Sequence, residues 1–373
     1  MFGAPLRGLG WSFLAVVFCH ACQSGPVELD AEQKEMVRPR HAKGFAWAMS
    51  DEGQTMLVVF QPRTGKAIAT VSSTEIRQGF DVGEDVPHIT INRARGFVTT
   101  STTHVHLLEA GSGLNGWRGC TSLKYLRDDG VLAWADSTAV RDVSGDGGLN
   151  AEVVTMLNPG VILTGPNQDL EERNWPWVPV TEYLEPHPLG RAEWMIPLAW
   201  MAGDSAAGAE AFKTIEARYA AAIQRSVKIE KRVFTGSVAD GVWHAPGRNS
   251  FVAQWIEDAG GIYALDAVAD ESNVALGLES MLELVSRTDA WVLVTYDEDG
   301  VTEDDVLGMD PRHAEVMKAV DDVWVCNTAE VDYFGEVVAH PDWVLEDLAA
   351  LVQSDSKGPH GVFHKLERPS PQR

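Results

Sequence analysis

The sequence predicts an α/β protein with two Rossmann-like lobes, each built on a central parallel sheet, bridged by a single long helix. Strand-like and helix-like segments alternate on both sides of residues 203–229, a pattern typical of parallel sheets covered by helices on both faces. Within this stretch apolar side chains recur at steps of three and four, at Phe212, Ile215, Tyr219, Ile223 and Val227. Such spacing predicts one uninterrupted helix that Asp204 or Ser205 can cap. The alternative is an ordinary surface helix within one larger α/β domain.

A helix from Asp204 to Lys228 would be about 37 Å long, at about 1.5 Å per residue, which is about the width of a small domain. At 373 residues the chain is long enough to form two separate cores. We therefore predict six segments: a signal peptide (1–21), a flexible leader (22–40), an N-terminal lobe (41–202), the bridging helix (203–229), a C-terminal lobe (230–353) and a flexible tail (354–373).

The charge balance is strongly acidic. The chain has 30 Lys and Arg against 54 Asp and Glu, a formal net charge of −24. Such a surface repels phosphate backbones and anionic headgroups, so nucleic-acid binding is disfavoured. The composition, 45% hydrophobic and 23% charged, is ordinary for a soluble globular protein.

The first residues have the pattern of an export signal. Arg7 is the only charged residue before Glu28, and the apolar run 11–18 (WSFLAVVF) is too short to span a membrane. Ala21 directly before Cys22 resembles a bacterial lipoprotein cleavage site, although Cys19 replaces the expected aliphatic residue. We expect an exported protein, periplasmic or at the cell surface, tethered by a lipid on Cys22, with plain signal cleavage as the alternative.

Two further cysteines, Cys120 and Cys326, lie in apolar contexts in different predicted lobes. Buried free thiols are therefore expected rather than a disulfide.

The N-terminal lobe is predicted to begin with a small β-meander over residues 41–71, because this stretch alternates and contains two turn signals. The strands expected after it are 96–100, 116–120, 139–143, 160–164 and 177–181, and the helices are 103–111 and 149–158. Asn150 is expected to cap the second helix, and Pro159 to end it.

The second half repeats this rhythm. The expected strands are 232–236, 262–265, 290–296 and 322–327, and the expected helices are 250–259, 276–287, 311–320 and 342–352. Asn249 and Asp310 are the predicted caps of the first and third of these helices.

Several stretches resemble the substrate-binding proteins of iron-complex and cobalamin ABC importers. They are VTEYLEPHPLGRAEW, GGLNAEVVTMLNPGVILT, GSVADGVWHAPGRNSFVAQWIEDAGG and VDYFGEVVAHPDWVLEDLAALV, with HAKGF and STTHVHLLEA near the start. Their order and spacing extend the resemblance over residues 41–352. The resemblance implies a monomer with two lobes bridged by one helix, a ligand between the lobes, and delivery to a membrane permease and its ATPase. A stiff bridge would permit only small lobe movements, so the cleft is expected to be pre-formed.

The candidate ligand-binding residues follow predicted strands, because ligands of open α/β sheets bind at the carboxyl ends of the strands. They are Thr102, Thr103, His104 and Tyr125 in the first lobe, and Trp243, His244, Arg248 and Tyr333 in the second. Ser101, Lys124, Gly165, Tyr296 and Phe334 lie in the same loops. Aromatic faces, hydroxyls and cations suit a bound ferric siderophore, haem or cobalamin. Each of these residues could instead have a structural role. The threonines could cap a helix, the histidine could form hydrogen bonds within the protein at the start of the helix, and the aromatic side chains could pack against the neighbouring lobe.

The charge of the cargo is left open by these residues. Lys124 and Arg248 favour an anionic complex, whereas Trp243 and Tyr333 favour a macrocycle.

The resemblance also implies one acidic residue on each lobe that docks onto the permease, and the matching positions are Glu152 and Glu279. A carboxylate that meets an arginine of the permease would provide orientation. Alternatively, Glu152 complements the macrodipole of its helix and Glu279 is a solvated helix residue.

Other chemistries find little support. The calcium-loop-like start at Asp142 has Val153 at its twelfth position, where a bidentate Glu is needed. His104 and His106 would point to different sides of a helix, the remaining histidines are scattered, and no hydrolase, protease or nucleotide motif is present. We therefore predict no catalytic residue and no intrinsic metal or cofactor. The competing hypotheses are an exported hydrolase that uses Ser101 or Ser237 with His104 or His244, haem ligation by the same two histidines, and a binder of free divalent metal.

Overall fold

The structure, a computed structural model, describes residues 36–49, 53–75, 82, 85–121, 123–146, 148–165, 170, 173–265, 273–320, 322–353 and 358–367. All of these residues fall in one compact unit, Glu35–Arg373. The predicted signal peptide and the lipidation site Cys22 lie outside the described residues.

The N-terminal β-meander is confirmed. Strands β1, β2 and β3 pair antiparallel in chain order, and β4 adds parallel to β3. The inward-facing residues of β2 are fully buried, because one face of this small sheet covers the N-terminal lobe. The bounds are β1 Phe45–Met49, β2 Thr55–Phe60, β3 Ala67–Ser72 and β4 His88–Thr90.

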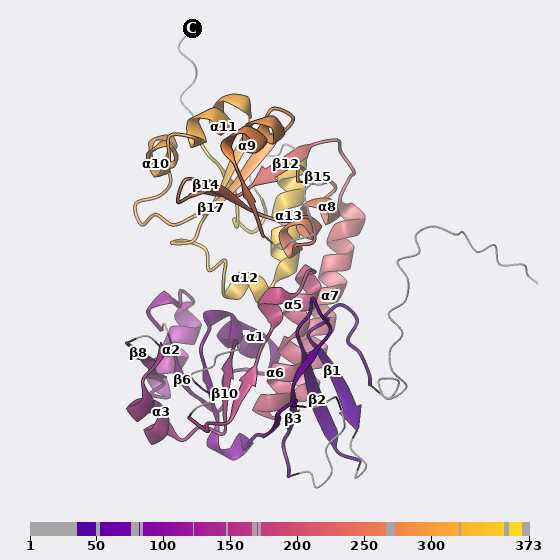
Figure 1. The fold of residues 1–373 in the computed structure, drawn as a ribbon, viewed down its shortest axis with the longest axis vertical. Helices are drawn as coiled ribbons and strands as arrows, with labels where there is room; N and C mark the ends of the chain where they lie inside the picture. The colour runs from indigo at the N-terminus through magenta and orange to yellow at the C-terminus, as the bar shows by residue number, and fades with distance from the viewer. Residues whose placement is uncertain are drawn as a thin grey trace, which may run out of the picture. The chain divides into compact units, whose positions relative to one another are not determined.

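The main sheet of the N-terminal lobe is parallel, as predicted, with the strand order β11-β10-β5-β6-β7. Figure 1 shows two of these strands, β6 and β10, in the lower half of the molecule. Its strands are β5 Phe97–Thr99, β6 Trp117–Cys120, β7 Arg141–Asp142, β10 Val161–Thr164 and β11 Trp177–Pro179. The helices are α1 Thr102–Ser112, α2 Asp129–Ser137, α3 Ala151–Leu157, α5 Pro188–Glu193 and α6 Met195–Ala202. Asn150 caps α3 as expected, but α2, α5 and α6 were not predicted.

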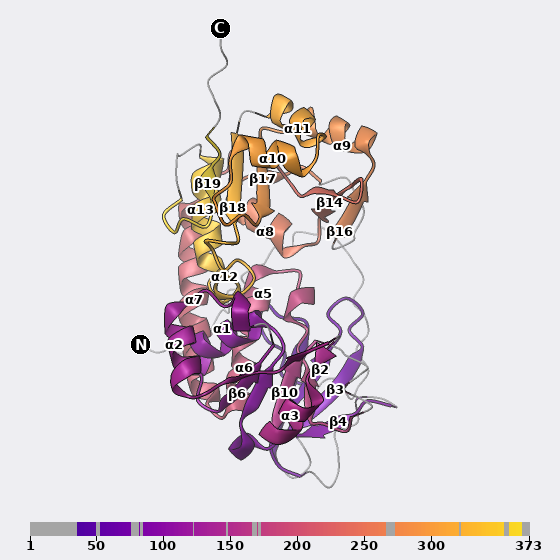
Figure 2. The same cartoon turned by 90° about the vertical axis from the view of Figure 1, so that its left-hand side faces the viewer.

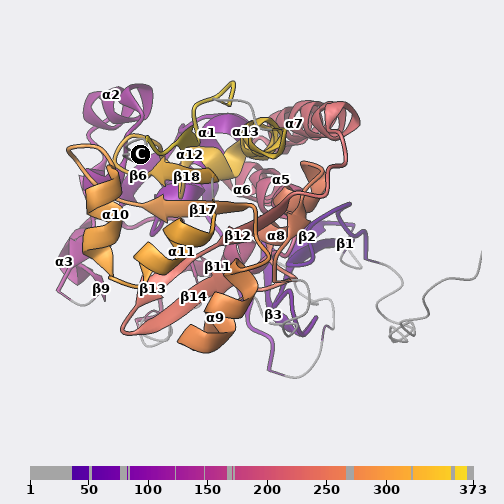
Figure 3. The ribbon, with the colours of Figure 1, turned by 90° about the horizontal axis from the view of Figure 1, so that it is seen from above.

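The C-terminal lobe has a second parallel sheet, ordered β15-β12-β17-β18, with β19 antiparallel at its edge. Figure 3 shows α13 on one side of this sheet and α11 on the other. The strands are β12 Arg232–Thr235, β15 Ile262–Tyr263, β17 Ala290–Thr295, β18 Asp322–Asn327 and β19 His364–Lys365. The helices are α8 Phe251–Asp258, α9 Leu278–Val285, α10 Glu303–Met309, α11 His313–Ala319, α12 Glu336–Ala339 and α13 Pro341–Val352.

A small antiparallel sheet in this lobe was not predicted. It consists of β13 Ser237–Ala239, β14 Val242–Pro246 and β16 Asn273–Leu276, in the order β13-β14-β16. It contains the stretch that the sequence analysis interpreted as a binding loop.

The bridging helix is α7, Ser205–Arg225, and it runs beside both lobes (Figure 2). The side chain of Asp204 caps it by accepting the N–H of Ala207, and it ends three residues before the predicted Lys228. Gly208, Phe212, Ile215, Tyr219 and Ala222 form its buried face. This face packs against α1 and α6 in the first lobe and against α13 in the second, so one helix belongs to both cores.

The chain touches the N-terminal lobe again after β18. Helix α12 packs against α1 and α5, and α13 then packs against α7 and α8. The loop that precedes α12 therefore lies at the junction of the two lobes, where it can line a site between them.

Four predicted boundaries are wrong. Residues 36–40 belong to the fold rather than to a flexible leader, because Val37 pairs with Trp47 and the N–H of Arg40 donates to Glu193. Residues 358–367 are not a frayed tail, because β19 joins the sheet. Ser250, rather than Asn249, caps α8, and α11 begins at His313 rather than after Asp310.

Candidate functional site

A cavity of about 360 Å³ lies between loops of the two lobes, and we call it the tyrosine cavity. Its walls follow the carboxyl ends of β5 and β6 in one lobe and of β17 and β18 in the other, as expected for open α/β sheets. It is lined by Thr100, Ser101, Thr102, Tyr125, Arg127, Tyr296, Thr328, Val331, Asp332, Tyr333 and Phe334.

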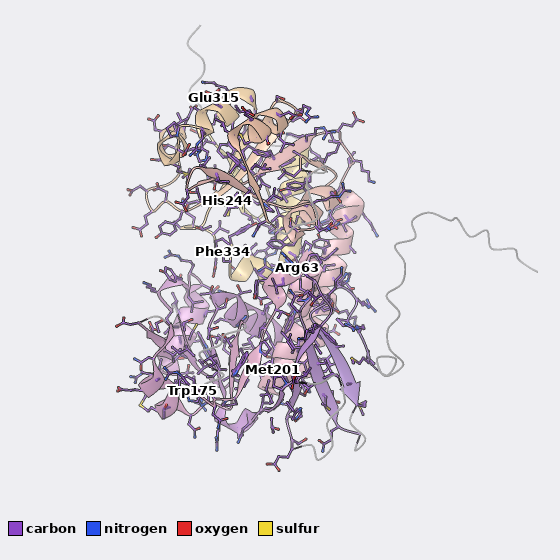
Figure 4. All side chains as sticks on the ribbon, in the orientation of Figure 1. Arg63, Trp175, Met201, His244, Glu315 and Phe334 are labelled. Atoms are coloured by element: carbon purple, nitrogen blue, oxygen red, sulfur yellow. The ribbon has the colours of Figure 1, made fainter. Side chains whose placement is uncertain are left out.

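Two further cavities share lining residues with one another or with this one. An apolar cavity of about 220 Å³ shares Tyr333 and Phe334 with the tyrosine cavity. A larger cavity of about 940 Å³, the basic cavity, shares Pro246, Phe251 and Val252 with the apolar one. We call the three together the cleft. Figure 4 shows Phe334 and Arg63, which line two of these cavities, at the level between the lobes.

Four predicted ligand residues line the cleft: Thr102, Tyr125 and Tyr333 in the tyrosine cavity and Arg248 in the basic cavity. Ser101, Tyr296 and Phe334 join them. Tyr125 is 56% exposed and carries Lys124 over its ring, with Nζ at 4.9 Å from the ring centroid. The cleft thus presents aromatic rings and hydroxyls from both lobes.

The prediction for Trp243 is wrong. This residue is on β14 rather than in a loop, its side chain is 2% exposed, and its ring stacks on Phe234 at 4.9 Å. The indole N–H donates to the carbonyl of Thr235 at 3.1 Å, so its polar group is satisfied inside the lobe. Because side chains alternate along a strand, His244 points the other way and is exposed. It is not among the lining residues of the three cavities.

The prediction that His104 contacts a ligand is also wrong. It is 3% exposed, with Nδ1 at 3.3 Å from the carbonyl of Leu163 and Nε2 at 3.6 Å from a carboxylate oxygen of Glu182. Burial alone would raise the pKa of Glu182, but the proximity of His104, helped by Arg191, lowers it below its usual value. His104 is therefore a core histidine, and ligation of haem by His104 and His244 is not supported.

Thr103 connects the lobes instead of facing a ligand. It is 6% exposed, and its Oγ1 donates a hydrogen bond to the carbonyl of Phe334. This contact fixes the loop that carries Tyr333 and Phe334 against α1.

The serines and histidines of the hydrolase hypothesis are not arranged as a nucleophile and its base. Ser101 accepts the N–H of Thr103 as the cap of α1, and Ser237 pairs with His244 only through the backbone. Over the described part of the chain, neither serine hydroxyl has a hydrogen bond to a histidine. A nucleophile within reach of its base is the first requirement of such chemistry.

Metal coordination and thiol chemistry find no site among the described residues. No group of three or more His, Cys, Asp or Glu side chains there is arranged to hold a metal ion. Cys120 and Cys326 are free and buried, as predicted. Burial raises the pKa of both thiols to about 12, so they remain protonated.

Two tyrosines of the tyrosine cavity have raised pKa values. Burial raises the pKa of Tyr333 well above its usual value, and Arg191 acts in the opposite direction. The hydrogen bond to Glu298 raises the pKa of Tyr296, while Arg127 of the other lobe lowers it. Both phenols therefore remain protonated near neutral pH; Tyr333 can donate a hydrogen bond to a ligand, whereas the hydroxyl of Tyr296 donates to Glu298 at 2.7 Å and can accept one.

The predicted docking residues are both on the surface. Glu152 and Glu279 are exposed in the first turns of α3 and α9. Exposed apolar side chains accompany them: Met156 is 63% exposed, Leu278 46% and Leu282 36%. These apolar neighbours were not predicted from the sequence.

Four cations of the cleft were also missed: Arg40, Lys43, Arg63 and Arg127. Arg63 is in the turn between β2 and β3, and Lys43 precedes β1, so neither follows a strand of the two main sheets. The only signal in the sequence was HAKGF, which contains Lys43.

The fold is that of the two-lobed periplasmic substrate-binding proteins, with parallel sheets and a bridging helix. A protein of Staphylococcus epidermidis described as a possible iron-binding (periplasmic solute-binding) protein matches with a TM-score of 0.51 and 14% identity, over 68% of this chain and 97% of that one. A periplasmic haem-binding protein of Pseudomonas aeruginosa matches with a TM-score of 0.52 and 16% identity, over 74% and 99%. The periplasmic vitamin B12-binding protein of Vibrio cholerae matches with a TM-score of 0.50 and 12% identity, over 70% of this chain and 97% of that one. These likenesses establish the fold.

In sequence, no model of a known protein family matches the chain. An uncharacterized lipoprotein of Methanocaldococcus jannaschii is 25% identical over 282 residues, 69% of this chain. The chain spans 65% of the length of that protein. None of the described helices is both long enough and apolar enough to cross a membrane.

Proposed function

We propose that this protein is the substrate-binding component of an ABC importer, which captures a metal chelate and delivers it to a membrane permease. The observation that carries the proposal is the cleft: the tyrosine cavity is lined by both lobes at the carboxyl ends of their parallel strands, the basic cavity is lined by both lobes, and the apolar cavity of the C-terminal lobe shares lining residues with each. The solved proteins with this fold are described as binding iron, haem or vitamin B12.

The proposed ligand contacts are Thr102, Tyr125, Arg248 and Tyr333, together with Tyr296 and Phe334. These side chains offer protonated hydroxyls and aromatic faces, which suit a ferric siderophore, a haem or a cobalamin. Binding would require no chemical change of the cargo, so the protein would not be an enzyme.

The proposed partners are a permease and its ATPase. Glu152 and Glu279 would dock onto permease arginines, and the exposed Met156, Leu278 and Leu282 would add apolar contact at the same surfaces. A lipid on Cys22 would hold the monomer on the outer side of the membrane.

The experiment for cargo binding is a thermal-shift panel with ferric siderophores, haem, cobalamin and free divalent metals. A ligand at about 100 times its Kd should add roughly 2.7 kcal/mol to the free energy of unfolding. Tyr125→Ala should reduce the shift, whereas Trp134→Ala, which removes an aromatic side chain outside the cleft, should not. Stabilisation by free metals alone, or by no ligand, would contradict the proposal.

Docking is tested separately by uptake in cells that rely on this protein. Glu152→Gln and Glu279→Gln should each reduce uptake and leave chelate binding to the purified protein unchanged. Glu283→Gln on α9 is the matched control, because this carboxylate is exposed and pairs with Arg287. Full uptake by the Glu152→Gln/Glu279→Gln double variant would rule out these two residues as docking contacts.

A further inference from the structure

The basic cavity is lined by four cationic side chains: Arg40, Lys43, Arg63 and Arg248. The carboxylates among its lining residues are Glu185 and Glu257. In a chain with a formal net charge of −24, an excess of cations around one cavity is opposite in sign to the protein as a whole. Clefts lined by one sign of charge concentrate ligands of the other sign.

Two of these cations are available to a ligand. Arg40 is engaged, because its guanidinium lies 2.8 Å from Glu216. Lys43 and Arg63 are exposed, and neither side chain forms an ion pair within the described part of the chain. They come from the N-terminal lobe, and Arg248 faces the same cavity from the C-terminal lobe.

Glu185 does not cancel these charges. Its carboxylate accepts the backbone N–H of Lys43 at 2.8 Å and of Gly44 at 2.7 Å, and the indole N–H of Trp194 at 3.0 Å. It is 1% exposed, and its oxygens accept hydrogen bonds from the backbone of the loop before β1. Burial raises the pKa of Glu185 to about 7, against the effect of these donors. Part of its charge is therefore lost near neutral pH.

The neighbouring apolar cavity completes the complementarity. Phe251 and Val252 line both cavities, and the guanidinium of Arg191 lies 4.4 Å from the ring centroid of Phe251 and holds it in place. A ligand with an apolar or aromatic body and acidic groups on its periphery would fill both spaces. A neutral complex in the same position would desolvate Lys43 and Arg63 without supplying a partner charge.

We infer that the cargo is an anionic chelate, whose acidic groups lie against Lys43, Arg63 and Arg248 in the basic cavity and whose apolar body enters the apolar cavity. This inference rests on the proposed function, because it specifies the charge of the cargo in that same cleft. Trp243, which together with Tyr333 favoured a macrocycle in the sequence, is buried in the lobe core and does not contact the cargo.

The test uses the full chain and three probes of different charge: an anionic ferric tris-catecholate, neutral cyanocobalamin and the cationic ferric complex of desferrioxamine B. Dissociation constants are measured by tryptophan fluorescence at low and at high salt. The catecholate should bind tightest, and its affinity should fall with added salt, because screening weakens exposed charge pairs. Lys43→Gln and Arg63→Gln should each weaken it about tenfold, and Arg63→Lys should restore most of the loss.

Lys66→Gln is the matched control, because Lys66 is an exposed cation close to Arg63 between β2 and β3 but does not line the cavity. The inference is overturned if cyanocobalamin or the cationic complex binds tightest and the Lys43 and Arg63 variants leave its affinity unchanged; the proposed function survives that result. If none of the three chelates binds to protein with a normal thermal transition, the inference and the proposed function fail together.

Discussion

The Nε2 atom of His106, on α1, lies 2.9 Å from Oδ2 of Asp332, in the loop that follows β18. The two side chains are 2% and 9% exposed. The pair therefore adds a contact between the lobes to those made by α7, α12 and Thr103, next to the tyrosine cavity that Asp332 lines.

Removing one partner of this pair should be strongly destabilising, since it leaves the other buried without its partner. Asp332→Asn should lower the free energy of unfolding by about 3 kcal/mol, measured in urea. Asp136→Asn, an exposed carboxylate on α2, should change it by less than about 0.5 kcal/mol. Equal effects of the two variants would show that the pair does not hold the lobes.

These connections should also keep the lobes at a nearly constant separation. Spin labels on Ser137→Cys and Ser286→Cys, exposed positions on opposite lobes, report that distance. Addition of cargo should shift it by less than about 2 Å, as in most pre-organised complexes. A large hinge rotation would refute the pre-formed cleft.

Close packing of α7 on α6 depends on Gly208. A Cβ atom at this position would lie 2.6 Å from Cβ of Ala199 and 3.0 Å from the carbonyl of Met195. Gly208→Ala should therefore lower the free energy of unfolding by about 1 to 3 kcal/mol. Gly308→Ala in α10, with no atom within 4 Å of the added Cβ, should instead raise it by up to about 1 kcal/mol. Stabilisation of the protein by both substitutions would show that close packing of α7 on α6 does not require glycine at position 208.

Glu185 should make stability depend on pH. Its pKa is raised from 4.5 to about 7 in the folded state, mainly by burial. The folded state thus binds the proton more tightly than the unfolded state, so this contribution to stability is full below about pH 4.5 and is lost as pH rises through 7. From pH 4.5 to 8 the loss should be roughly 3 kcal/mol.

Comparison with Glu185→Gln isolates this effect, because glutamine does not titrate. The free energy of unfolding of the unmodified protein, relative to the variant, should fall as pH rises over that range. A constant or rising difference would mean that the carboxylate is ionised throughout.

The two buried thiols should be inert in the native protein. With pKa values of about 12, almost no thiolate is present at pH 8, and the thiolate is the reactive form. In a Cys19→Ser/Cys22→Ser variant, a thiol reagent should label neither residue until denaturant is added, and then both. Labelling before unfolding would show that a thiol is accessible.

Local pattern was sufficient for most of the fold. The periodicity of α7, its cap Asp204 and the alternation of strands with helices predict the bridging helix and the parallel sheets, because these depend on neighbours within a few residues. The general position of the cleft followed as well, since the carboxyl ends of parallel strands meet at one edge of a sheet. Whether Glu152 and Glu279 dock onto a permease stays a prediction.

What the sequence by itself determined was therefore the class of fold, the helix that joins its halves and the loops that face each other. The tertiary structure decided which side chains line the cleft. Trp243 was mistaken for a ligand contact because its burial depends on β14 pairing with β16, about thirty residues further along the chain. Lys43 and Arg63 meet Arg248 in one cavity only because the lobes are brought together, and such long-range contacts leave no local pattern in the chain.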